Sequence, residues 1–212
     1  MIDLIKQMIG ARWKGQRPAI VIGMGHGATH WIIACLYVLL PYLSEELDLS
    51  YTEAGSLITL FHASSFVANV GSGAIVDIVG RHVQIQAASL FIGAAALVLA
   101  GIADGLPWLM AAVVVIGITN NLWHPAAISY LSRTYPEARG FALSIHTLGA
   151  SLGDILAPLA AGTLLLVLTW HGTASVSALP VFAIATLIFV LLNEQGARIS
   201  GPRPHGSFKD YL

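Results

Sequence analysis

Five histidines and one aspartate lie deep within the long apolar stretches of this sequence: His26, His30, His62, His124, His146 and Asp154. Asp154 is the one carboxyl group deep in such a stretch. Because hydrocarbon disfavours the charged form of a carboxyl group, Asp154 is a candidate to take up and release a proton. A histidine beside it would extend this to a relay, since imidazole titrates near neutral pH. The plainer alternative is that Asp154 joins two helices through one hydrogen bond.

Two of these histidines have the spacing of a metal-binding pair. His26 and His30 lie four residues apart, so they share one face of a helix. The local sequence fixes no third ligand, and we expect no metal site and no cofactor. Taken singly, His26 and His30 are better explained as cavity-lining or hydrogen-bonded histidines, and the other three as packed side chains. As a set, they indicate a polar interior.

The composition places these residues in a membrane protein. Of the 212 residues, 56% are hydrophobic and 10% are charged, and the mean hydropathy is +0.77, whereas about a quarter of a soluble domain is charged. The net charge of -1 and the absence of a phosphate-binding loop argue against nucleic-acid binding. The apolar stretches predict six membrane-spanning helices, at 18–43, 52–79, 83–103, 106–131, 138–168 and 174–192.

The charges between these helices predict the topology. All ten lysines and arginines fall on one side, and the other side carries acidic residues or an uncharged turn at 170–173. The positive-inside rule then places both termini in the cytoplasm, with the chain integral to the cell inner membrane. We expect three parts: a cytoplasmic amphipathic segment at 1–17, the six-helix domain at 18–192 and a polar cytoplasmic tail at 193–212.

Polar residues inside the spans predict which helices face a cavity, because lipid excludes unpaired polar groups. The first, second, fourth and fifth helices carry them, and the third and sixth have no histidine or ion. The expected cavity-lining residues are His26, His30, Tyr37, His62, Asn69, Asn120, Asn121, His124 and His146. The pattern repeats after three helices, which indicates an all-α bundle built as a three-plus-three inverted repeat.

The loop after the second helix reads Gly73-x-x-x-Asp77-x-x-Gly80-Arg81. Gly73 permits close helix approach, Gly80 permits a tight turn, and Asp77 opposite Arg81 gives a charge pair at the membrane edge. With this signature, residues 25–192 resemble the amino-terminal half of a major facilitator superfamily transporter, although His82 stands where Arg or Lys is usual. The resemblance implies that the loop is a conformational latch against a second half.

The fifth helix strengthens the resemblance. Pro136-Glu137-x-Arg139-Gly140 precedes a run with Gly149, Gly153, Pro158 and Gly162, similar to the fifth helix of many efflux members. His26, His30 and His124-Pro125 are similar to the fosmidomycin-resistance-like efflux branch. The fourth helix lacks the arginine that proton-coupled antiporters often carry, and Asn120 and Asn121 stand near that depth.

The resemblance implies a secondary transporter of a small organic solute, with proton-coupled efflux as the finer expectation. Because the family moves two six-helix halves against each other, this chain supplies one wall of a cavity. Its expected partners are the lipid bilayer, the solute, and a second transporter half or another copy of the chain. The alternative is a non-transporting accessory or assembly subunit, or a truncated transporter. No nucleophile and base pair indicates an enzyme.

Overall fold

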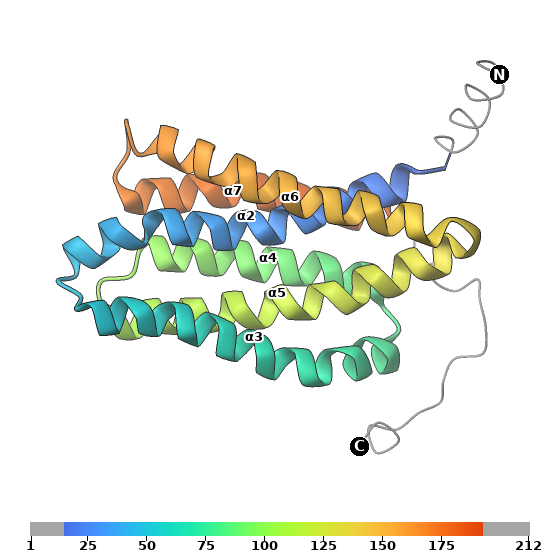
Figure 1. Cartoon of the computed structure of the whole chain (residues 1–212), viewed down its shortest axis with the longest axis horizontal. Helices are drawn as coiled ribbons and strands as arrows, with labels where there is room; N and C mark the ends of the chain where they lie inside the picture. Colours follow the sequence, from blue (N-terminus) through green and yellow to red (C-terminus); the bar gives the residue numbers. More distant parts are fainter. Residues whose placement is uncertain (1–14, 193–212) are drawn as a thin grey trace.

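A computed structural model describes residues 15–192 as a bundle of six long helices (Figure 1). They are α2 (Arg17–Glu46), α3 (Tyr51–Val79), α4 (His82–Gly101), α5 (Leu106–Thr134), α6 (Arg139–Leu164) and α7 (Trp170–Leu191), with a short 3₁₀ turn, η1 (Pro136–Ala138), before α6. All six are long and apolar enough to cross a bilayer. The predicted all-α six-helix fold is therefore confirmed. Most of the predicted amphipathic segment and the predicted tail lie outside the described residues.

Local sequence fixes several of the helix ends. Ser50 begins α3 with a capping box, in which its hydroxyl accepts from the Glu53 N–H and the Glu53 carboxylate accepts from the Ser50 N–H. Gly80 ends α3 in the left-handed region at φ 62°, as the predicted tight turn requires. Thr169 caps α7 through Gly172. Residues 170–173, predicted as a turn, therefore form the first turn of α7.

The packing of the helices follows the predicted three-plus-three repeat. The α2–α6 contact corresponds to the α5–α3 contact. The α4–α5 contact likewise corresponds to the α7–α2 contact. When α2, α3 and α4 are exchanged for α5, α6 and α7, each of these contacts takes the place of its counterpart. The α4–α7 contact is unchanged by the exchange. Because α2 and α5 run in opposite directions, the two halves are related as an inverted repeat.

Glycines bring α2 and α6 together along a tight seam. A Cβ atom added at Gly149 would collide with the carbonyl oxygen of Gly23, and one at Gly153 with that of Gly27. The two backbones therefore touch directly, as small residues at a four-residue spacing permit in membrane helices. This seam fixes the positions of the α2 and α6 side chains that lie beside it.

The two ends of the bundle differ in charge. The end that holds the start of α2 and the α3–α4 and α5–α6 connections, here the Arg81 end, carries every described arginine: Arg17, Arg81, Arg133 and Arg139. The opposite end, here the Glu46 end, carries Glu45, Glu46, Asp48, Glu53 and Asp104. At the Arg81 end, the Tyr135 hydroxyl donates to the Gly15 carbonyl oxygen (2.6 Å), and burial raises the pKa of this phenol.

The third membrane helix, predicted at 83–103 without a histidine, begins at a histidine and is well buried. Helix α4 begins at His82, whose side chain is buried and lies 3.1 Å from the Ser129 hydroxyl of α5. More of α4 than of α3 is buried within the chain, because α4 contacts α5, α7 and α2 whereas α3 packs chiefly against α5. In Figure 1, α3 accordingly lies at one edge of the bundle.

Candidate functional site

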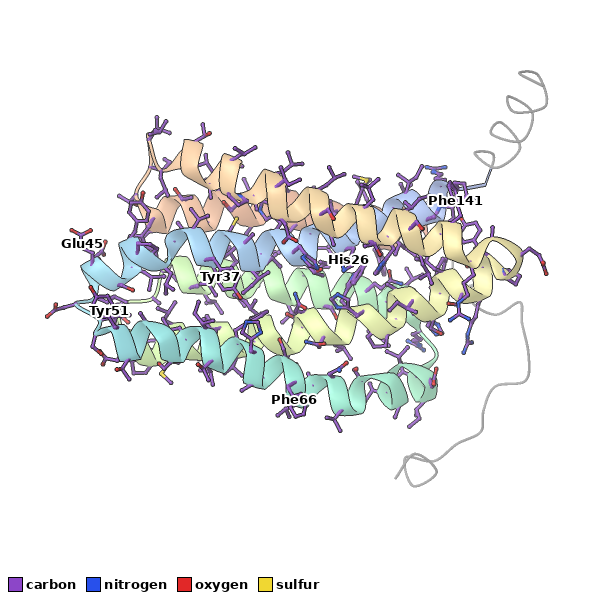
Figure 2. All side chains as sticks on the ribbon, viewed as in Figure 1. His26, Tyr37, Glu45, Tyr51, Phe66 and Phe141 are labelled. Carbon is purple, nitrogen blue, oxygen red and sulfur yellow. The ribbon has the colours of Figure 1, made fainter. Side chains whose placement is uncertain are left out.

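Four of the predicted histidines meet near the middle of the bundle, where Figure 2 labels His26. The Nδ1 atom of His26 lies 2.8 Å from the His146 carbonyl oxygen, and its Nε2 atom lies 3.1 Å from Nε2 of His124. The rings of His26 and His146 stack with their centroids 3.8 Å apart. One ring nitrogen from each of His26, His30 and His124 lies within 4.8 Å of the others. Helices α2, α5 and α6 thus build one histidine cluster.

Asp154 pairs with a histidine of this cluster, a contact that the relay hypothesis requires. Its Oδ1 atom lies 3.0 Å from Nδ1 of His30, across the α2–α6 seam. The side chain of Asp154 is 55% exposed and that of His30 is 31% exposed. Asp154 is therefore not enclosed by the helices of this chain, and the pair faces the surroundings of the bundle.

The remaining predicted cavity residues are divided between the cluster and α3. The Asn120 carbonyl oxygen accepts from Nδ1 of His124 (2.7 Å), and the neighbouring Asn121 is half-buried. The Tyr37 hydroxyl lies 3.2 Å from Nε2 of His62, about two helical turns from His30 along α2. Asn69 is exposed on α3, seven residues beyond His62. The structure therefore gives a compact cluster and a separate exposed Tyr37–His62 pair.

The latch loop departs from prediction in its ion pair. The Asp77 carboxylate lies 3.8 Å from the Arg133 guanidinium of α5. Arg81 is exposed, and within residues 15–192 no ion pair joins it to Asp77. The sequence favoured the nearer arginine, but α5 brings Arg133 to the same end of the bundle. A Cβ atom added at Gly73 would meet nothing within 4 Å, so the expected close approach at Gly73 does not occur among residues 15–192.

Two sets of contacts to polar side chains were not predicted from the sequence. Trp123 is fully buried and stacks on both His26 and His146, with centroids 5.5 and 5.6 Å apart. At the Glu46 end, the Glu46 carboxylate accepts from Trp170 Nε1 and His171 Nε2, both at 2.7 Å. The predicted topology already placed residues 170–173 on the same side of the membrane as Glu46. That shared side was the sequence signal from which this contact could have been predicted.

An apolar groove of about 230 Å³ lies between α2, α6 and α7. Its lining includes Met24, Trp31, Leu152, Leu156 and Ile184 and no titratable side chain. A groove of this chemistry fits acyl chains or apolar ligands and offers nothing to orient a polar solute. The polar groups gather instead at the histidine cluster and along the exposed face of α3.

Two solved structures share this fold. A bacterial homologue of the human lysosomal transporter Spinster, in its inward-facing unoccupied conformation, matches with a TM-score of 0.68 and 16% identity, over 90% of this chain and 45% of that chain. The inward-facing occupied conformation matches with a TM-score of 0.58 and 17% identity, over 94% and 46% of the two chains. The chain thus spans about half the length of these transporters. No match was found among curated proteins.

A sequence profile places the chain in a family. The profile described as Major Facilitator Superfamily matches residues 22–210, which is most of the sequence. The match agrees with the six membrane-length helices and with the two transporter structures. The chain is therefore an integral membrane protein that belongs to the Major Facilitator Superfamily.

Proposed function

We propose that this chain is a six-helix unit of a secondary transporter, and that α2, α3, α5 and α6 form one wall of the path of a small organic solute. The observation that carries the proposal is the gathering of polar side chains from these four helices. His30 and Asp154 from α2 and α6, Tyr37 and His62 from α2 and α3, and Asn121 from α5 are all at least partly exposed. Lipid would disfavour such a surface, whereas a hydrated path would not.

The proposed path requires a second six-helix unit opposite this wall. Much of α3 is uncovered in the isolated chain: Phe66, Val67 and Val70 are 70–78% exposed, and Figure 2 shows Phe66 at the outer edge of the bundle. Gly55, Gly71 and Gly73 have open space beside them. Another copy of the chain or a separate second half would cover this helix and bring its own residues to the path. The Gly73–Arg81 loop would then serve as the latch between the units.

Asp154 is the proposed coupling residue. Its carboxylate is held by His30 at 3.0 Å and remains accessible. A proton that binds to this pair changes the net charge that the pair presents to the solute. The plainer role of Asp154, which is to join α2 to α6, uses the same contact with His30. Only a transport measurement distinguishes the coupling role from the structural one.

The proposed direction is proton-driven efflux across the cell inner membrane, with both termini cytoplasmic. The arginine-rich Arg81 end supports this orientation by the positive-inside rule. The resemblance of His26, His30 and His124-Pro125 to the fosmidomycin-resistance-like branch makes an organic phosphonate a suitable first probe.

The test is transport by the reconstituted chain, alone and with any separately encoded second half. Fosmidomycin and ethidium serve as an anionic and a cationic probe, with and without a pH gradient. We expect gradient-driven flux of a probe for the natural chain, and loss of the gradient-driven part in Asp154→Asn with downhill exchange retained. Asp104→Asn, at the exposed Glu46 end, is the matched control and should transport normally.

The outcomes separate the alternatives. Equal gradient-driven flux in Asp154→Asn and the natural chain would remove Asp154 from coupling and leave it as a structural tie. Absence of flux of either probe, with and without a second half, would favour the accessory-subunit alternative over transport.

A further inference from the structure

We propose that His26, His30 and His124 form a binding site for one divalent transition-metal ion, with Zn²⁺ as the best-fitting candidate. The sequence offers only a two-histidine pair on one helix face. The structure adds the third histidine from α5, and one ring nitrogen of each residue lies within 4.8 Å of the other two.

The hydrogen bonds of two rings determine where their protons lie. Nδ1 of His26 faces the carbonyl oxygen of His146 (2.8 Å), and Nδ1 of His124 faces that of Asn120 (2.7 Å). A carbonyl oxygen only accepts, so each Nδ1 carries the hydrogen and each Nε2 of a neutral ring carries a lone pair. Yet these two Nε2 atoms lie 3.1 Å apart. Two lone pairs at this distance repel each other unless a metal ion or a proton lies between them.

The separation fits two ligands of one metal ion. Two imidazole nitrogens bound to a tetrahedral Zn²⁺ at about 2.0–2.1 Å lie about 3.3 Å from each other. The observed 3.1 Å between the Nε2 atoms is close to that value. The third nitrogen, at up to 4.8 Å, requires a modest movement of His30, whose side chain is 31% exposed.

The surroundings of the three rings resemble those of metal-binding histidines. Such a histidine usually donates its second ring N–H to a backbone carbonyl or a carboxylate, which fixes the tautomer and aims the other nitrogen at the ion. Here His26 and His124 donate to carbonyl oxygens, and Nδ1 of His30 faces the Asp154 carboxylate. In all three rings Nε2 is therefore the nitrogen that remains as a ligand atom.

The site also has a closed side and an open side. Behind His26, the rings of His146 and Trp123 stack against it and exclude water. In front, His30 and His124 are only half-buried, so an ion can enter and a fourth position remains for water or a solute group. Three protein ligands with an open fourth position are typical of zinc sites that exchange or activate a ligand.

This inference does not rest on the proposed transport function, because its readout is metal binding. The full chain is purified in detergent with an affinity tag that lacks histidine. Calorimetric titration with Zn²⁺ measures affinity and stoichiometry, and titration with Co²⁺ reports the ligand geometry through its visible absorption. We expect one ion per chain and a tetrahedral Co²⁺ spectrum.

Variants identify the ligands. His30→Gln and His124→Gln should each weaken Zn²⁺ binding by at least about tenfold, and Asp154→Asn by about tenfold or more, since loss of an outer partner typically costs 10–100-fold. His62→Gln and His171→Gln are the matched controls and should bind as the natural chain does. His26 is buried, so His26→Gln is interpreted only if circular dichroism and size-exclusion profiles match those of the natural chain.

The inference fails if the natural chain binds no Zn²⁺ or Co²⁺, or if His30→Gln and His124→Gln bind as tightly as the controls. In that case a shared proton satisfies the two facing Nε2 atoms. Asp154→Asn also distinguishes this failure from failure of the proposed function, because gradient-driven flux and metal affinity are measured separately.

Discussion

The α2–α6 seam and the outer face of α3 carry similar small residues in opposite surroundings. In the seam, Gly149 and Gly153 leave no room for a Cβ atom, because the carbonyl oxygens of Gly23 and Gly27 occupy it. On α3, the glycines at 55, 71 and 73 have nothing within 4 Å. The seam is completed within the chain and holds His30 beside Asp154. The α3 face has open space beside these glycines among the described residues, and the proposed second unit would dock there.

The largest effect should come from filling the seam. Gly149→Ala places a methyl group on the Gly23 carbonyl oxygen and should lower the free energy of unfolding by about 1–3 kcal/mol, as overpacking does. Gly162→Ala, on the same helix with open space beside it, should leave stability unchanged or raise it by up to about 1 kcal/mol. Thermal unfolding in detergent measures both. Equal stability of the two variants would show that the seam is looser than described.

Photo-cross-linking should distinguish a docked α3 face from a lipid-facing one. Val70 on α3 and Val190 on α7 are similarly exposed, at 78% and 68%. Each is replaced by cysteine in a Cys35→Ala chain and labelled with benzophenone maleimide in native membranes. We expect Val70→Cys to give an adduct with a copy of the chain or with another six-helix unit, and Val190→Cys to give lipid adducts. Lipid adducts at both positions would contradict docking at α3.

The latch loop should show a smaller effect that depends on backbone geometry. Gly80 adopts a φ of 62°, where an alanine costs about 1–2 kcal/mol. Gly80→Ala should therefore destabilise the isolated chain by about that amount. Gly73→Ala introduces no backbone strain and meets no neighbour in the described part of the chain, so it should not destabilise the protein. Chemical denaturation in detergent compares the two, and a larger loss in Gly73→Ala would reverse this interpretation of the loop.

The smallest effect is expected at the exposed pair between α2 and α3. Tyr37→Phe removes the hydroxyl that lies 3.2 Å from His62 Nε2. One accessible hydrogen bond contributes about 0.5–1.5 kcal/mol at most, so the unfolding midpoint should shift only slightly. If the midpoint falls as far as in Gly149→Ala, the α2–α3 contact is a principal support of the fold.

Much of this architecture was predictable because lipid imposes a strict pattern on sequence. Apolar length predicted the six helices, and the polar residues inside the spans predicted a polar interior. The sequence did not indicate that His30 would lie beside Asp154 or Tyr37 beside His62. The glycines gave less specific predictions of helix packing. Gly149 and Gly73 have the same chemistry, and the sequence does not indicate which has its neighbour within the chain.

Contacts between distant helices were the least predictable. Asp77 pairs with Arg133 instead of the nearby Arg81 because α3 and α5 pack side by side. The approach of His26 to His124 depends on ring rotation as well as helix position. At the Glu46 end, His171 reaches Glu46 because α7 begins earlier than its hydropathy suggested. Each case requires three-dimensional packing that periodicity does not contain.

Water accessibility at His62 tests most directly whether the polar wall faces a hydrated path. His62→Cys and the control Val190→Cys, each in a Cys35→Ala chain, are reconstituted in nanodiscs with any second unit and exposed to a membrane-impermeant maleimide. A hydrated path predicts rapid labelling of His62→Cys and slow labelling of Val190→Cys. Equally slow labelling of the two cysteines would contradict it and place the α3 face in lipid.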